Sequence, residues 1–276
     1  MSEITFSVSE GIATIQLNRP ATLNALTPKA ESRGKDYDDL AKALRDIDSR
    51  DDVVVTLLQA TGKWFCAGTS VRSKPPEQIQ ESLGSVRNAL FNNVARTTLD
   101  CSKALYSHRK ILVAALNGPV MGITAALLGL FDFIYCMPNM WMSTPFTFLG
   151  IVAEGGASAS FVNRMGVAKA NEMLIWGKKK EANELLQCGF VNKIFPQQPV
   201  ESFHKEVWNL LKAELENLDP TAVLTTKKLI KAGLNDKNDF DAINLRESYA
   251  QAERFASGIP FVQFARIANK EIRHKL

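Results

Sequence analysis

The sequence has few of the residues from which metal sites and disulfide frameworks are built. Its 276 residues include only four cysteines and three histidines. No two cysteines stand at the short spacing of a zinc site or a redox dithiol, and no two histidines stand at the i, i+4 spacing of a helical metal site. We therefore expect reduced core thiols and no protein-bound transition metal.

The sequence also lacks a large excess of either charge and a long apolar run. Lysine and arginine total 33 against 29 acidic residues, which leaves a net charge of +4. That excess is too small for a protein that follows a nucleic-acid backbone, although it suits a small polyanionic ligand. The longest apolar run, near residues 123–131, is about half the length of a membrane span. The N-terminus lacks a basic region followed by an apolar stretch. We expect a soluble, non-secreted protein with no nucleic-acid or membrane partner.

Short β-rich runs and amphipathic stretches alternate through the first two thirds of the chain. Hydrophobic residues make up 46% of it, which allows a sizeable core. The run 53–58 is apolar almost throughout, as is typical of a strand buried on both faces. Strands are predicted at 5–8, 12–17, 53–58, 111–116 and 133–136, with the first two forming a hairpin. Helices are predicted at about 28–47, from the breaker at 74–76 to 108, and at 123–130, 158–165, 168–176 and 181–187.

From residue 196 onward the pattern is helical only, with helices predicted at 202–218, 220–233 and 240–256. We expect an α/β core over residues 1–195 and a helical segment over residues 196–276. The apolar faces of that segment must be buried on the core or on another subunit. Its larger apolar residues are Trp208, Leu211, Leu215, Phe240, Phe255 and Phe261.

Two glycine-containing loops each follow a predicted buried strand. The first, 62–70, allows tight turns that can expose a backbone amide, and it lacks a nucleotide-loop pattern. The second, 117–124, enters a helix, and free amides at a helix N-terminus stabilise negative charge. Each loop alone is more often a simple turn. Because they follow consecutive parallel strands, the two together could supply the paired amides of an oxyanion hole.

A third segment, 146–158, holds one carboxylate, Glu154, among apolar residues. A carboxyl group desolvated in this way is a usable proton carrier near neutral pH. The alternative is a first-turn glutamate stabilised by a helix dipole. Residues 156–160 nearly form a nucleophile elbow, but the last glycine is missing, which weakens a serine-hydrolase interpretation.

The three loops, in this order and spacing, resemble those of the crotonase (enoyl-CoA hydratase/isomerase) superfamily. The resemblance begins at 13–20 and 23–26 and covers nearly the whole chain. It implies an α/β spiral of ββα units with a C-terminal helical trimerisation region, and therefore a homotrimer or hexamer. It also implies a coenzyme A thioester whose carbonyl lies between the amides of Thr69 and Ile123. Coenzyme A is then part of the substrate, and no separate cofactor is expected. The implied substrate-binding residues are Asn24, Ala25, Leu26, Ala67, Gly68, Gly122 and Phe146.

Departures from the hydratase pattern decide the expected reaction. Hydratases carry two glutamates where this sequence has Ala126 and Phe146, and Thr69-Ser70 replaces their usual Ala-Asp. What remains is Glu154, at the position where fungal and peroxisomal Δ3,Δ2-enoyl-CoA isomerases carry their single acid/base glutamate. The resemblance thus implies that Glu154 moves a proton from C2 to C4 of a 3-enoyl-CoA during oxidation of unsaturated fatty acids. Dienoyl-CoA isomerases fit less well, because they need a second acid at the place of Phe146.

Two other functions stay open at this point. One is a hydratase-like enzyme of a specialised pathway, and the other is a non-catalytic acyl-CoA-binding homologue. A lone carboxylate in an apolar loop argues against the second.

The chain ends in His274-Lys275-Leu276, which resembles a peroxisomal targeting tripeptide. We therefore expect the peroxisomal matrix as its location and the peroxisomal import receptor as a partner. The alternative is a basic tail that ends in leucine by chance.

Overall fold

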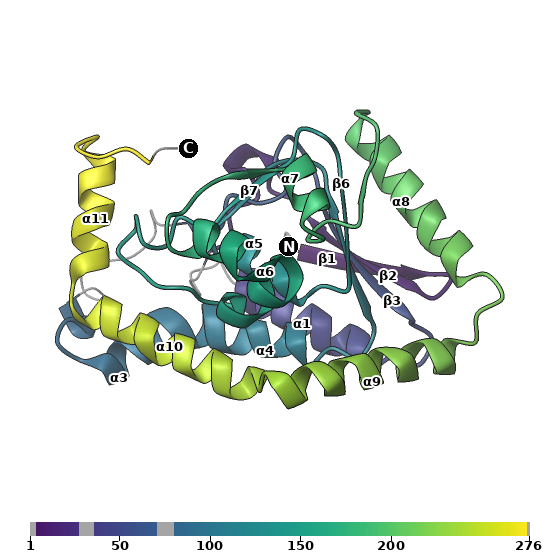
Figure 1. Ribbon diagram of the computed structural model, residues 1–276, viewed down its shortest axis with the longest axis horizontal. Coiled ribbons are helices and arrows are strands. Elements are labelled where there is room, and N and C mark those ends of the chain that lie inside the picture. The colour runs from purple at the N-terminus through teal and green to yellow at the C-terminus, as the bar shows by residue number, and fades with distance from the viewer. Residues whose placement is uncertain (1–3, 28–35, 71–79, 275–276) are drawn as a thin grey trace.

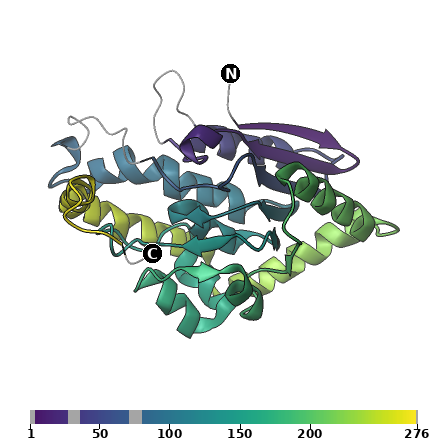
Figure 2. The same ribbon diagram turned by 90° about the horizontal axis from the view of Figure 1, so that it is seen from above.

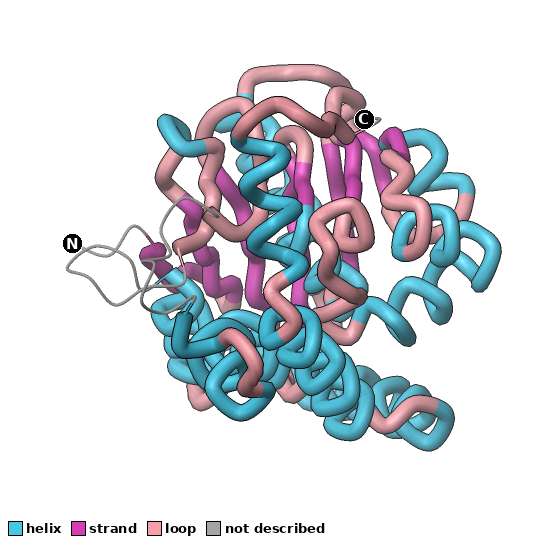
Figure 3. Tube along the Cα trace, turned by 90° about the vertical axis from the view of Figure 1, so that its left-hand side faces the viewer, coloured by secondary structure: helices cyan, strands magenta, loops and turns pink. Residues whose placement is uncertain are grey.

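A six-stranded sheet forms the centre of the molecule in the computed structural model, which describes residues 4–27, 36–70 and 80–274. The strand order is β1-β2-β3-β4-β6-β9. Figures 1 and 3 show the strands with helices around them. β1 and β2 pair antiparallel as the predicted hairpin, and every other pair in this sheet is parallel. The strands are β1 (Ile4–Ser9), β2 (Ile12–Leu17), β3 (Val55–Ala60), β4 (Ile111–Leu116), β6 (Phe133–Cys136) and β9 (Lys193–Ile194).

A second, smaller sheet holds strands in the order β5-β7-β8. They are β5 (Val120–Met121), β7 (Trp141–Ser143) and β8 (Lys180–Glu181). Strands this short carry no alternation of polar and apolar residues, so the sequence did not predict them. The strand predicted at 53–58 lies two residues further on, in register with β2 and β4.

Both faces of the central strands β3 and β4 are buried, which explains their nearly continuous apolar runs. Along β4, Leu112, Ala114 and Leu116 face one hydrophobic cluster, whereas Val113 and Ala115 face the other. The first cluster is covered by α1 (Asp36–Asp48), α4 (Cys101–Tyr106) and α5 (Gly122–Leu127). Figure 2 shows α8 (Val200–Leu215) alongside the sheet, and its Phe203, Val207 and Leu211 complete the second cluster.

The helix predicted from 74–76 to near residue 108 is not continuous, and its part before residue 80 lies outside the described residues. Residues 80–82 are helical and are followed by a turn, after which come three consecutive elements. They are α3 (Val86–Ala89), a π-helical stretch η3 (Leu90–Asp100) and α4. π-helical segments are rare and are frequently found at functional sites. The predicted helix at 123–130 is α5 followed by the 3-10 turn η4 (Leu128–Leu130), and a further 3-10 turn, η1, covers Pro20–Thr22.

The two helices predicted at 158–165 and 168–176 form one unit, α6 (Ala157–Leu174), kinked at Gly166. Gly166 has a φ of +76°, which interrupts regular helix geometry. α7 (Ala182–Gln187) follows as predicted.

Beyond residue 196, α8, α9 (Pro220–Lys237), α10 (Phe240–Ala256) and α11 (Ile259–Ala268) follow one another. In Figure 1, α9 and α10 run end to end beneath the sheet, and α11 stands upright beyond them. The sequence did not predict α11. α10 packs on η3 and α3 of the same chain. None of the described helices is long and apolar enough to cross a membrane.

The apolar residues of this segment named above are mostly covered by the chain's own core. Leu211 and Phe255 are buried, and Trp208, Leu215 and Phe261 pack against the two clusters. Other apolar residues of this segment do reach solvent, on α9, α10 and α11, and those on α9 are among the most exposed. There Leu229, Ile230 and Leu234 are exposed, with 67% and 62% of the first two accessible. Beside them, a groove of about 940 Å³ separates α8 and α9 from the sheet and α6.

Candidate active site

The first and second glycine loops lie side by side. Phe65 donates a backbone hydrogen bond to the Pro119 carbonyl at 3.0 Å, and Met121 donates one to the Cys66 carbonyl at 3.0 Å. Gly68 has a φ of +83°, and a Cβ atom there would stand 2.9 Å from the Met121 carbonyl oxygen. Glycine is therefore required at position 68 by both its backbone conformation and the close approach of the second loop.

The amide of Thr69 is directed away from the segment beside it. Leu26 forms a parallel bridge to Thr69, in which the Leu26 amide bonds to the Gly68 carbonyl and the Ser70 amide bonds to the Leu26 carbonyl, both at 2.8 Å. In a parallel bridge of this kind, the residue between the two bonded positions is Thr69, and its own N–H group points away from Leu26. Among the described residues, the Thr69 amide donates no hydrogen bond.

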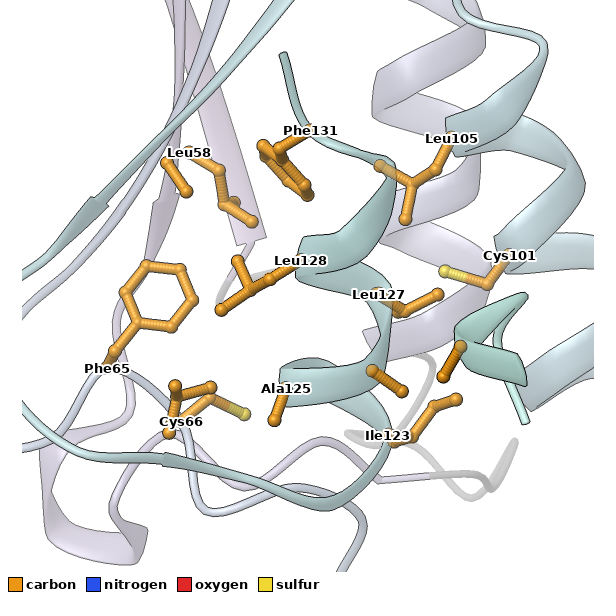
Figure 4. Close-up of a cluster of buried hydrophobic side chains, with 14 of the residues drawn as sticks. Leu58, Phe65, Cys66, Cys101, Leu105, Ile123, Ala125, Leu127, Leu128 and Phe131 are labelled. Carbon is orange, nitrogen blue, oxygen red and sulfur yellow. The ribbon is translucent and has the colours of Figure 1, made fainter. Parts of the chain in front are cut away.

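Ile123 is the second residue of α5, so its amide has no partner within the helix. No side chain caps this end of α5, and within the described part of the chain the Ile123 amide donates no hydrogen bond. Ile123 itself is buried among core residues on the α5 face seen in Figure 4. The predicted pair of amides, at Thr69 and Ile123, thus comes from two loops that touch at Gly68 and Gly122.

Glu154 lies in the loop before α6 and is only 8% exposed. Its Oε2 atom accepts two hydrogen bonds, from Thr98 Oγ1 at 2.9 Å and from Gln251 Nε2 at 2.8 Å. A Cβ atom on the following residue, Gly155, would stand 3.1 Å from Ile123 Cδ1 and 3.4 Å from Ala126 Cβ. The loop that carries Glu154 therefore packs directly on α5, the helix that carries the second amide.

Helix α10 holds the Glu154 loop at several points. Gln251 accepts from the Val152 amide at 3.1 Å while it donates to Glu154. One turn earlier, Glu247 accepts from the amides of Gly156 and Ser158 at 2.7 and 2.9 Å. Glu247 thereby caps the start of α6, and burial raises the pKa of its carboxyl group. Since Glu247 and Gln251 are four residues apart, they lie on one face of α10.

Tyr37 contacts the first loop from helix α1. Its hydroxyl lies 2.6 Å from Thr69 Oγ1. Burial raises the pKa of Tyr37 well above its ordinary value of 10.0, and the charge of Glu154 acts in the same direction. Tyr37 is therefore a neutral hydroxyl placed within electrostatic reach of the carboxylate.

The remaining predicted residues divide into two groups. Leu26, Ala67, Gly68 and Gly122 lie at the junction of the loops, where the Ala67 amide bonds to the Leu23 carbonyl at 3.0 Å. Asn24 uses its side chain within the protein, donating to the Thr61 and Trp64 carbonyls at 2.8 and 2.9 Å. Ala25 is partly exposed next to it. Phe146 is completely buried in the hydrophobic core, and its contact with substrate stays a prediction.

The four cysteines are free, as expected. Burial raises the pKa of the Cys66 thiol to about 11, and its sulfur lies 3.1 Å from Thr124 Oγ1 under the first loop. The described residues contain no group of three or more His, Cys, Asp or Glu side chains that could hold a metal ion. His274 packs edge-on against the Phe148 ring, while Lys275 and Leu276 lie outside the described residues.

Four side chains of this site were not identified from the sequence as functional. Thr98 and Gln251 are 56 and 97 residues from Glu154, and nothing in the local pattern around either marks it. Glu247 belongs to a helix that the sequence predicted without indicating whether the core or another subunit covers it. Tyr37 looked like one more residue of an amphipathic helix face.

The sequence matches the enoyl-CoA hydratase/isomerase family over residues 7–257. It is 38% identical to a Δ(3,5)-Δ(2,4)-dienoyl-CoA isomerase of Pyricularia oryzae, with all of both chains covered. It is 30% identical to the peroxisomal enoyl-CoA delta isomerase 3 of Mus musculus, over 91% of this chain and 74% of that protein. The fold is similar to the crystal structure of an enoyl-CoA hydratase/isomerase from Pseudoalteromonas atlantica T6c, with a TM-score of 0.80, 26% identity and full coverage of both chains. The chain therefore belongs to the enoyl-CoA hydratase/isomerase family and has the crotonase fold.

Proposed function

We propose that the protein is a Δ3,Δ2-enoyl-CoA isomerase that converts 3-cis- or 3-trans-enoyl-CoA to the 2-trans isomer. The observation that carries this proposal is that Glu154 lies buried on a loop packed against α5, without glutamates at the two places where hydratases carry them. The two places where hydratases carry glutamates hold Ala126 and Phe146, and both are completely buried. A hydratase needs two carboxylates to position and split a water molecule, whereas a 1,3-proton shift on one face of the substrate needs one proton carrier.

The mechanism uses three groups of this chain. The thioester carbonyl oxygen would accept hydrogen bonds from the amides of Thr69 and Ile123. Glu154 removes a proton from C2, and the electrons of that C–H bond move onto the carbonyl oxygen to form an enolate. The protonated carboxyl group then returns the proton to C4, so the double bond moves to C2–C3 and Glu154 is a carboxylate again. Amide donors of this kind contribute about 10²–10³ in rate each, and a positioned base about 10²–10⁴.

A second candidate is a Δ3,5,Δ2,4-dienoyl-CoA isomerase, because the relative with 38% identity carries that name. In that reaction the proton leaves C2 and a proton arrives at C6, farther along the chain. A single carboxylate serves the shorter shift more directly, and we therefore place the Δ3,Δ2 reaction first.

One assay separates the two functions. Purified protein is given 3-trans-enoyl-CoA and 3,5-dienoyl-CoA of equal chain length in parallel, and the conjugated products are followed by their ultraviolet absorbance. The proposal predicts a higher kcat/KM for the 3-enoyl substrate. A higher kcat/KM for the dienoyl substrate, or efficient hydration of 2-enoyl-CoA, would overturn it.

We also propose a homotrimer, or a dimer of trimers, with α9 at the contact between subunits. The support is the exposed row of Leu229, Ile230 and Leu234 and the groove next to it. Apolar patches that remain on a folded chain usually mark association surfaces.

We further propose that the protein acts in peroxisomes, which agrees with the name of the similar mouse protein. A fluorescent fusion that leaves the C-terminus free should colocalise with a peroxisomal matrix marker. A uniformly cytosolic signal would contradict this location.

A further inference from the structure

We infer that Thr98 and Gln251 are positioning residues that hold the carboxyl group of Glu154 in place through its Oε2 atom. This inference rests on the proposed function and adds to it how the base is oriented. Both residues donate to the same oxygen atom, from two elements that lie far apart in the sequence.

The two donors occupy the hydrogen-bonding capacity of Oε2. A carboxylate oxygen has two in-plane lone pairs, and each of the two hydrogen bonds uses one of them. At 2.9 and 2.8 Å, both contacts have the length of ordinary hydrogen bonds. These two bonds therefore fix the orientation of the carboxyl group that removes the proton from C2 and returns it to C4.

The donors are themselves held in place. Thr98 is 1% exposed and lies in the π-helical stretch η3. Gln251 is also 1% exposed, and its own carbonyl oxygen accepts from the Val152 amide. This second bond fixes which end of the carboxamide faces Glu154, so Gln251 can act there only as a donor.

Donors directed at a carboxylate favour its charged form. Removal of either donor should therefore make Glu154 easier to protonate and should also loosen its orientation. The first effect moves the acidic limb of the kcat/KM profile to higher pH, and the second lowers kcat. A residue that merely stabilises the fold would change neither.

The test uses matched substitutions in the full chain. Thr98→Val keeps the shape and removes the donor, whereas Thr98→Ser keeps the hydroxyl and should restore wild-type behaviour. Gln251→Leu removes the donor from α10. Arg254→Met is the control, because Arg254 also reaches the loop from α10, through its Nε bond to the Gly150 carbonyl at 2.8 Å, but does not contact Glu154.

We expect Thr98→Val and Gln251→Leu each to lower kcat at least tenfold with KM changed less than threefold. Each should also move the acidic limb of the kcat/KM profile to higher pH. Thr98→Ser and Arg254→Met should stay within threefold of wild type in kcat with an unshifted profile. The inference would be overturned if both Thr98→Val and Gln251→Leu kept wild-type kcat and an unshifted pH profile. It would also be overturned if Arg254→Met showed the effects expected of the two donor variants.

A readout that does not need turnover separates this inference from the proposed function. The titration of the Glu154 carboxyl can be followed by infrared difference spectroscopy, with Glu154→Gln identifying its band. A midpoint that moves to higher pH in Thr98→Val and Gln251→Leu supports the positioning role even if the wild-type protein isomerises no enoyl-CoA. An unmoved midpoint contradicts that role even if the wild-type protein is an active isomerase.

Discussion

The backbone of Gly68 lies so close to Met121 that a Cβ atom at Gly68 would stand 2.9 Å from the Met121 carbonyl oxygen. This contact joins the two loops whose amides would bind the thioester oxygen. Any side chain at position 68 must therefore push the loops apart and change the distance between the Thr69 and Ile123 amides.

Gly68→Ala should consequently lower kcat/KM by at least about tenfold, since the loss of one oxyanion donor costs about 10²–10³. Gly84→Ala is the matched control. Gly84 also has a positive φ, +71°, but no atom of the described residues lies within 4 Å of the site of its Cβ. Both variants should lose about 1–2 kcal/mol of stability from the left-handed backbone conformation. Steady-state kinetics and denaturant unfolding measure the two effects, and equal kcat/KM values would contradict the oxyanion assignment.

Glu154→Gln should lower kcat by about 10²–10⁴, the contribution of a general base, with little change in acyl-CoA affinity. The amide oxygen of glutamine can take the place of Oε2 and accept from Thr98 and Gln251, which preserves the local packing. Glu253→Gln, an exposed position on α10, is the control and should be fully active. Single-turnover assays together with ligand-binding titration make the comparison. If Glu154→Gln keeps more than a tenth of wild-type isomerisation, the assignment of the base is wrong.

His108 should make the protein less stable in mild acid. Burial and the nearby charges of Lys227 and Lys231 lower the pKa of its imidazole to about 3, although Asp48 acts in the opposite direction. The neutral ring lies 2.7 Å from Thr56 Oγ1 through Nε2. Because an unfolded histidine takes up a proton below about pH 6.5 and the folded one does not, stability falls as the pH drops from about 6.5 toward 3.

The change in the free energy of unfolding that His108 alone contributes is at most about 1.4 kcal/mol per pH unit. His108→Gln removes the titration and keeps a polar partner for Thr56. Urea unfolding at pH 7.5 and 5.0 should therefore show a smaller loss for His108→Gln than for the wild-type protein. Equal losses would show that His108 does not carry this pH dependence.

Ile230→Glu on α9 should weaken the proposed association, because it places a charge in the exposed apolar row with Leu229 and Leu234. Lys228→Glu changes charge on another side of the same helix and is the control. Light scattering at micromolar concentration should report a trimer or hexamer for the wild-type protein and for Lys228→Glu, and a smaller species for Ile230→Glu. A wild-type protein that is monomeric at that concentration would contradict the proposal.

The sequence alone was sufficient for the elements whose signal is local. The β1–β2 hairpin, β4 and β6 lie where the sequence predicted them. β4 is an unbroken apolar stretch because both of its faces are buried. The two glycine loops and the solitary Glu154 could also be identified, since each is a short segment at a fixed place after a strand. The strand predicted at 53–58 is observed two residues later, as β3. Its ends are set by pairing with β2 and β4 and not by its own composition.

Only the tertiary structure decided what surrounds the carboxylate. Thr98 and Gln251 reach Glu154 from 56 and 97 residues away, and no periodicity within either helix indicates which polar side chain will be turned inward. The same limit applies to the segment beyond residue 196. Its amphipathic pattern required burial but could not indicate that α8 and α10 cover this chain's own core while α9 keeps Leu229 and Ile230 exposed. The hydrophobic effect is non-directional, so a sequence shows which faces must be covered, and only the packed chain shows by what.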